Sequence, residues 1–280
     1  MQQVVEGTRR VAAIQMASGP RIEGNQQEIR RLLQIAANGG AELAVLPENA
    51  MLMGMAETDK LAVRETDEGG PLQGFFAAEA ARLGIWIIAG TIPMAGADPA
   101  RARQSCLVFD AEGRRVARYD KIHLFDVDVE GDTAYRESNT LEPGNTVVTV
   151  DSPFGRIGLS VCYDLRFPEM YRLLIEHGAD LLVVPSAFTA KTGEAHWRTL
   201  VRARAIENLC TVIAPNQGGY HVNGRETHGE TMIVDSWGRI LDSLSRGSGV
   251  VFGDIDIQRQ RELRQHFPAL DHRRFRVVEA

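Results

Sequence analysis

Cysteine is scarce in this 280-residue chain, which contains three: Cys106, Cys162 and Cys210. They are odd in number and far apart, with no C-x-x-C pair and no Cys/His cluster at zinc spacing. This pattern argues against a disulfide framework and against a structural zinc site. Long hydrophobic runs are lacking too. The longest uncharged apolar stretch, 83–97, is interrupted by a proline and is shorter than a membrane-spanning helix requires.

Positive charge is not in excess, because 31 Lys and Arg residues stand against 37 Asp and Glu residues, giving a formal net charge of −6. That balance argues against non-specific binding to nucleic acid or to an anionic membrane. The first residues lack the basic start and apolar run of a signal peptide, so we predict a cytoplasmic protein. No linker rich in Ser, Pro or Gly divides the chain. We therefore predict one domain over residues 1–280, whose segment from about 256 to 280 packs on a partner subunit or on its own core.

Hydrophobic periodicity predicts an α/β fold. Apolar residues spaced by three and four predict helices at 25–40 and 74–84, each ending at a glycine, and short apolar strands precede and follow them. Two β-hairpins are predicted at 106–125 and 231–245. The sheets are therefore expected to be mixed rather than purely parallel.

The second half of the chain continues this alternation. A strand from residue 156 turns into a helix at 168–177, and a long amphipathic helix is predicted at 194–209. Segments 125–155 and 215–230 have no regular pattern and are predicted to be irregular. Long loops in compact domains are often functional, so we expect these two segments to form the rims of a site.

Cys162 lies where the strand from residue 156 turns toward the next helix. Close to the positive pole of a helix, the pKa of a thiol is lowered and its nucleophilic thiolate becomes more populated. An inert buried cysteine is the alternative. The segment GLSVC begins like the G-x-S-x-G elbow of serine hydrolases, but it ends in cysteine and places Ser160 inside the strand. None of the seven histidines stands out as the base of a Cys–His hydrolase.

Two charged residues lie at other strand ends. Glu48 follows Pro47 at the end of a buried strand. An unpaired carboxylate is costly in such a place, and its pKa rises. A general base that works near neutral pH requires such a raised pKa. A helix cap or a buried ion pair is the alternative for Glu48. Lys121 ends an otherwise apolar strand, and an exposed edge lysine is the alternative there.

Three segments, LAVLPEN, RYDKIHL and GLSVCYDLRFPE, resemble in this order the glutamate, lysine and cysteine motifs of the nitrilase superfamily of carbon–nitrogen hydrolases. The resemblance extends from the first strand to FPALDHRRF near the end of the chain. It implies a four-layer α-β-β-α sandwich with two mixed sheets that forms a homodimer. It also implies an amidase whose catalytic triad is Glu48, Lys121 and Cys162, with Cys162 as the nucleophile.

The same resemblance implies further parts of the site. A fourth carboxylate often accompanies the triad in the family, and Glu137 lies in the matching place, although Glu142 is a rival that the sequence does not exclude. The backbone N–H of Tyr163, directly after the nucleophile, would stabilise an oxyanion together with Lys121. Neither a metal ion nor an organic cofactor is expected. The implied partner is a small-molecule amide, not nucleic acid or a membrane.

The segments CYDLRFPE, LVRARAIEN and NGRETHG most resemble the branch that holds deaminated glutathione amidases and omega-amidases, which act on amides of 2-oxoglutarate. NGRETHG favours the first activity, which converts deaminated glutathione to 2-oxoglutarate and cysteinylglycine through a cysteine thioester. Within the family, the alternative is omega-amidase activity on 2-oxoglutaramate or another small aliphatic amide. Outside it, the alternative is a catalytically silent dimeric binding protein.

A 2-oxo acid substrate requires a cation for its carboxylate. Arg166, four residues after Cys162, is the best-placed candidate, and a salt bridge to Glu169 is its alternative. Trp197 is expected to line the pocket, and packing in the core is its alternative. The chain departs from its relatives at Glu230, where they usually have histidine, and this added charge is expected to alter specificity if it meets substrate or partner. By resemblance, the pocket is expected to be lined by Phe188, Thr189, His196 and Trp197.

Overall fold

Strand β1 (Arg9–Gln15) defines the layers of the fold. The computed structural model describes residues 7–130 and 133–278. Val11 and Ala13 enter a core between two β-sheets, whereas Ala12 and Ile14 enter a second core beneath two helices. Successive side chains of a strand point to opposite faces of its sheet, so β1 is buried on both sides.

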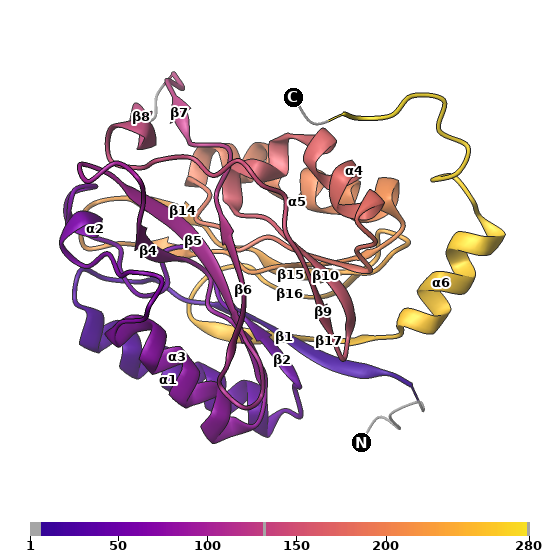
Figure 1. Cartoon of the computed structure of the whole chain (residues 1–280), viewed down its shortest axis with the longest axis horizontal. Coiled ribbons are helices and arrows are strands. Elements are labelled where there is room, and N and C mark those ends of the chain that lie inside the picture. Colours follow the sequence, from indigo (N-terminus) through magenta and orange to yellow (C-terminus); the bar gives the residue numbers. More distant parts are fainter. Residues whose placement is uncertain (1–6, 131–132, 279–280) are drawn as a thin grey trace.

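The first sheet has seven strands of mixed direction. In spatial order they are β17 (Gly249–Ile255), β1, β2 (Leu43–Val45), β3 (Trp86–Ile88), β5 (Ala102–Phe109) and β4 (Ile92–Ala95), with β6 (Arg115–Asp120) paired to β5. β1, β2 and β3 run parallel, whereas β17 and β5 are antiparallel to their neighbours. Helices α1 (Ile22–Asn38) and α3 (Pro71–Leu83) cover the outer face (Figure 1), where side chains such as Leu32 and Phe76 fill the second core.

The second sheet has six strands and faces the first. In spatial order they are β16 (Ile240–Leu244), β15 (Thr231–Val234), β12 (Thr211–Ala214), β11 (Leu181–Val183), β10 (Gly155–Leu159) and β9 (Thr149–Ser152). Helices α4 (Pro168–Glu176) and α5 (Ala190–Asn208) lie on its outer face (Figure 1). The predicted four-layer α-β-β-α sandwich with two mixed sheets is confirmed.

Shorter elements connect these layers and lie at the edges of the site. They are α2 (Asp59–Ala62), the pair β7 (Asp126–Val127) and β8 (Tyr135–Arg136), the pair β13 (Gly218–Tyr220) and β14 (Glu226–His228), and two 3₁₀ helices, η1 (Glu137–Asn139) and η2 (Cys162–Arg166). Segments 125–155 and 215–230 are thus not irregular throughout, as the sequence predicted. Strands of two or three residues are too short to produce a detectable two-residue period.

The C-terminal helix α6 (Ile257–His266) packs on its own chain. Gln260 is buried, donates to the Asp180 carbonyl at 2.7 Å and accepts from the Thr211 N–H at 2.8 Å. Arg261 Nη2 lies 2.7 Å from the Asp180 carboxylate. These contacts fix the first part of the segment 256–280, whereas Phe275 beyond it is 90% exposed. Among the described helices, none has the length and apolar character needed to cross a membrane.

Candidate active site

Three strand ends from the two sheets meet at one buried cluster. Glu48 follows β2 and Lys121 follows β6, both in the first sheet, while Cys162 follows β10 in the second. The exposed fractions of these residues are 1%, 1% and 7%. The side chains expected from the sequence to form a catalytic triad are therefore brought to one place by the packing of sheet on sheet.

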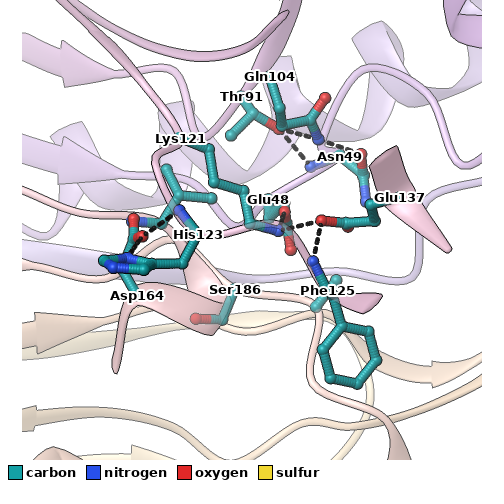
Figure 2. Close-up of polar contacts among 12 residues, drawn as sticks. Glu48, Asn49, Thr91, Gln104, Lys121, His123, Phe125, Glu137, Asp164 and Ser186 are labelled. Carbon is teal, nitrogen blue, oxygen red and sulfur yellow. Dashed lines mark hydrogen bonds and ion pairs between the residues drawn. The ribbon is translucent and has the colours of Figure 1, made fainter. Parts of the chain in front are cut away.

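The Lys121 ammonium lies between two carboxylates. Its Nζ is 2.9 Å from Glu48 Oε1 and 2.8 Å from Glu137 Oε2 (Figure 2). Burial would lower the pKa of Lys121, but the charges of Glu137 and Glu48 hold it well above its usual value. Burial would likewise raise the pKa of Glu137, but Lys121 and nearby Lys60 lower it to about 2. Lys121 is thus a permanent cation and Glu137 a permanent anion at neutral pH.

Glu142, the alternative to Glu137, lies elsewhere. Its carboxylate pairs with Arg103 and accepts the N–H of Asp98 at 3.0 Å. Glu137 Oε2, by contrast, also accepts the N–H of Phe125 at 2.8 Å, which ties the start of the loop after Lys121 to the same carboxylate. Glu137, and not Glu142, is therefore the second carboxylate beside Lys121.

Cys162 occupies a strained backbone turn. Its φ is 50°, a left-handed conformation that costs a residue with a Cβ about 1–2 kcal/mol, and its N–H donates to the Pro185 carbonyl at 2.9 Å. Burial raises the pKa of the thiol well above its usual value, and the charge of Glu48 raises it further. The predicted lowering of this pKa by a helix pole is therefore wrong, because desolvation beside carboxylates outweighs it. A neutral thiol needs a base before it can attack.

Asp164, which the sequence analysis overlooked, links the lysine segment to the cysteine turn. It is fully buried, and its Oδ2 accepts the Val161 N–H at 2.8 Å and the Tyr119 hydroxyl at 2.7 Å. Its Oδ1 accepts the His123 N–H at 3.1 Å and contacts His123 Nδ1 at 2.8 Å (Figure 2). Tyr119 and His123 flank Lys121, and Val161 precedes Cys162. The only sequence signal was the aspartate itself, two residues after the cysteine.

Replacing Asp164 by asparagine is expected to loosen this link. An amide presents one acceptor oxygen and an NH₂ group to the buried donors of Val161 and Tyr119 and to the half-buried His123, and each buried donor left unsatisfied costs about 1–3 kcal/mol. We expect the free energy of unfolding in urea to fall by roughly 2–4 kcal/mol and kcat to fall at least about tenfold. Tyr119→Phe removes one donor and leaves the carboxylate intact, so it should cost less in both measurements. Equal losses in the two variants would contradict the linking role.

A small pocket opens onto the cluster. Four residues that the sequence predicted for substrate contact lie in its wall: Tyr163, Arg166, Phe188 and Thr189. The Arg166 guanidinium lies 5.3 Å above the Phe188 ring, and its Nη1 is 3.2 Å from His196 Nδ1. The alternative for Arg166, a salt bridge to Glu169, is not among the ion pairs of the described residues. The remaining lining residues are Glu48, Phe125, Glu137, Cys162, Ala187, Thr192 and Arg225.

Two predicted lining residues lie outside this wall. Trp197 is fully buried behind Phe188, with 4.8 Å between ring centroids, and its Nε1 donates to the Glu230 carbonyl at 2.7 Å. His196 is on the exposed side of α5 and is linked to the pocket through Arg166. The helical period placed both residues correctly on α5, but it could not tell which side chain faces the pocket and which faces the core.

Glu230 does not line the pocket either. Its carboxylate pairs with Arg198 of α5 and lies 3.2 Å from His228 Nε2. Its φ of 57° bends the chain between β14 and β15. The added charge at this position is therefore neutralised on the outer side of the pocket, away from Cys162.

Residues 10–265 match the carbon–nitrogen hydrolase family. A deaminated glutathione amidase of Synechocystis sp. (strain PCC 6803 / GT-S) is 44% identical over 267 residues, which cover 94% of this chain and 97% of that protein. A deaminated glutathione amidase of Yersinia enterocolitica is 41% identical, with 95% of this chain and 93% of that protein covered.

Solved structures agree with this match. The NitFhit protein of C. elegans superposes with a TM-score of 0.85 at 35% identity, covering 96% of this chain and 65% of that chain. XC1258 of Xanthomonas campestris, a CN-hydrolase superfamily protein with an arsenic adduct in its active site, gives 0.83 at 29% identity, covering 97% and 99%. Family match, near full-length relatives and fold agree with the clustered Glu48, Lys121 and Cys162: the chain belongs to the carbon–nitrogen hydrolase family and is an amidase of the nitrilase superfamily.

Proposed function

We propose that the protein hydrolyses deaminated glutathione to 2-oxoglutarate and cysteinylglycine through a thioester on Cys162. The observation that carries this proposal is the Lys121 ammonium held 2.9 Å from Glu48 and 2.8 Å from Glu137, two carboxylates that line the same pocket as the buried Cys162 thiol. This arrangement supplies a base, a cation and a nucleophile without a further group. The names of the relatives that cover nearly the whole chain support the choice of substrate.

In the first half of the reaction, Glu48 takes the proton of Cys162 Sγ, and the thiolate attacks the amide carbon. Negative charge develops on the carbonyl oxygen, where Lys121 Nζ and the N–H of Tyr163 donate hydrogen bonds. Tyr163 lies in the first turn of η2, where backbone N–H groups have no partner within the helix. Glu48 then gives its proton to the leaving nitrogen, the C–N bond breaks, and a thioester remains.

In the second half, a water molecule attacks the thioester carbon while Glu48 accepts its proton. The C–S bond breaks, Glu48 returns the proton to Sγ, and the acid product leaves. Glu137 acts as a positioning residue, since its carboxylate holds Lys121 Nζ and the Phe125 N–H at 2.8 Å each. The high pKa of Lys121 keeps three donors on Nζ throughout the cycle.

Arg166 is the proposed partner of the 2-oxo acid carboxylate. Its guanidinium lies over the rings of Tyr163 and Phe188, at 5.8 Å and 5.3 Å from their centroids. Such stacking orients the planar donor group, and a fixed guanidinium suits a carboxylate. Thr189, at the start of α5, completes this wall.

The test is release of 2-oxoglutarate by the purified protein from deaminated glutathione and, separately, from 2-oxoglutaramate. We expect release mainly from deaminated glutathione and none from Cys162→Ala. Cys106→Ala is the matched control, because Cys106 is fully buried in the inter-sheet core and should leave the rate unchanged. Release mainly from 2-oxoglutaramate would make the protein an omega-amidase with the same mechanism. Release from neither would overturn the substrate and favour a silent binding protein.

We also propose a homodimer and a single functional unit over residues 1–280. Large apolar side chains remain exposed beside α6, where Trp237 (64% exposed) and Phe267 (49%) contact each other with ring centroids 5.8 Å apart. Burial of such side chains favours association. A cytoplasmic location stays a prediction.

A further inference from the structure

Arg225 is a second cation in the wall of the pocket, and no part of the mechanism above uses it. It comes from the turn between β13 and β14, where its N–H donates to Asn223 Oδ1 at 3.0 Å and its carbonyl accepts the His221 N–H at 2.9 Å. His221 is itself buried, with Nδ1 2.8 Å from the Ser18 carbonyl. The turn therefore holds the backbone of Arg225 in place.

The guanidinium of Arg225 is largely buried, and few interactions balance its charge. Its side chain is 13% exposed, lies 5.1 Å from the centroid of the Tyr135 ring, and donates from Nη2 to the Ala187 carbonyl at 3.0 Å. Its ion-pair partner among the described residues is Glu57, at 4.0 Å from Nη1, beyond hydrogen-bond distance, and Glu57 is bound more closely by Lys60 at 2.9 Å. Arg225 Nε has no hydrogen-bond partner in the described part of the chain. A buried cation of this kind favours an anionic ligand.

Arg225 and Arg166 contact different residues of the pocket wall. Ala187 connects Arg225 to the nucleophile, since its carbonyl accepts from Arg225 at 3.0 Å and its backbone N–H acts to lower the pKa of the Cys162 thiol. The charge of Glu48 also acts on Arg225. Arg166 lies instead on the wall of Tyr163 and Phe188. Of the two arginines, Arg225 is the one that these contacts and charges link to Ala187 and Glu48.

The leaving nitrogen must point toward Glu48, because Glu48 gives it a proton. The amine half of the substrate then extends along the Glu48 side, and the acyl half extends toward Arg166. In deaminated glutathione the amine half is a dipeptide, whose terminal carboxylate lies at most about 7 Å beyond the scissile nitrogen when extended. The substrate thus has one carboxylate on each side of the reacting carbon, and the pocket wall holds two arginines with different neighbours.

We propose that Arg225 binds the terminal carboxylate of the leaving group and so selects amides whose amine half is an anionic dipeptide. This inference rests on the proposed function. It predicts that a simple amide such as 2-oxoglutaramate fills the acyl side and leaves Arg225 without its anion. Discrimination between the two substrates would then come from the β13–β14 turn and not from the catalytic residues.

The experiment compares three substrates: deaminated glutathione, the same compound with its terminal carboxylate converted to a carboxamide, and 2-oxoglutaramate. In the unaltered protein we expect kcat/KM to be about ten- to a hundredfold higher for the carboxylate than for the carboxamide. In Arg225→Gln this ratio should fall toward one, through a higher KM with kcat little changed. Arg225→Lys keeps the charge and should retain part of the preference. Arg246→Gln, a surface change beside the same hairpin, should leave the ratio as it was.

Several outcomes separate this inference from the proposed function. If the unaltered protein does not hydrolyse deaminated glutathione, the proposed function has failed whatever Arg225 does. If it does, but treats carboxylate and carboxamide alike, the assignment of Arg225 is overturned without any variant. Equal losses on all three substrates in Arg225→Gln would also overturn it, since they indicate a structural role. Arg166→Gln should instead lower kcat/KM for all three substrates, because each has the same acyl half.

Discussion

Replacing Glu48 by glutamine is expected to lower kcat by about a thousandfold or more. The thiol of Cys162 has a raised pKa, so it depends on a base, and the same carboxylate must also protonate the leaving nitrogen and activate water. The glutamine carbonyl can still accept from Lys121 Nζ, which lies 2.9 Å from Glu48 Oε1. The fold should therefore survive while proton transfer is lost. The measurement is kcat with deaminated glutathione from pH 6 to pH 9.

Two comparisons make this prediction specific. Alkylation of Cys162 by iodoacetamide should be slow in Glu48→Gln at neutral pH and should rise with hydroxide concentration, because bulk base replaces the missing carboxylate. Glu142→Gln is the matched control, since Glu142 pairs with Arg103 outside the pocket and should leave kcat nearly unchanged. A Glu48→Gln enzyme that keeps more than a tenth of its kcat would exclude Glu48 as the base.

Replacing Lys121 by methionine is expected to have the largest effect on stability. The Lys121 side chain is fully buried, and its removal leaves the carboxylates of Glu48 and Glu137 together without their cation. Breaking a buried ion pair from one side costs about 3–5 kcal/mol. The oxyanion also loses a donor, which lowers kcat by about a hundred- to a thousandfold. Urea unfolding and kcat measure the two effects.

The pH dependence of stability should change sign in this variant. In the unaltered protein the pKa of Glu137 is lowered from 4.5 to about 2, so its ion pairing stabilises the fold above about pH 4.5. That contribution is lost as the pH falls toward 2. Without Lys121, burial dominates and raises the pKa of Glu137, so the free energy of unfolding should increase as the pH falls from 8 to 5. Parallel pH curves for the two proteins would contradict this.

A compensating change provides the control. In the double variant Lys121→Met with Glu137→Gln, one of the two buried negative charges is removed along with the cation. We expect it to recover part of the lost stability but none of the lost kcat. Recovery of activity would mean that Lys121 serves only to balance charge.

The sequence predicted the site residues that lie in recognisable motifs at the ends of strands. Glu48, Lys121 and Cys162 could be placed because a buried strand stops at each of them, and the order of the motifs matched one family. Glu137 and Glu142 could not be distinguished, since both lie in one irregular segment and only the fold decides which approaches Lys121. Trp197 was placed on the apolar face of its helix, but the pattern could not say that Phe188 separates it from the pocket.

Asp164 and Arg225 were missed for a related reason. Asp164 acts through Tyr119 and His123, more than 40 positions earlier in the chain. Arg225 reaches the pocket from the turn between two strands of three residues, and strands this short leave no periodic pattern that would place the turn. The contacts of Asp164 and of Arg225 cannot be derived from local periodicity. These contacts depend on how the two sheets pack together.

The base and the lysine belong to the first sheet, whereas the nucleophile belongs to the second. The separation between Glu48 and Cys162 is therefore set by the thickness of the hydrocarbon layer between the sheets, which in such sandwiches is about 10 Å. Asp164 links the two sheets across this layer, because its carboxylate accepts hydrogen bonds from the Tyr119 hydroxyl of β6 and from the Val161 N–H after β10. In this architecture the inter-sheet core acts as a spacer for proton transfer, so a change that alters the separation of the two sheets would also alter a catalytic distance.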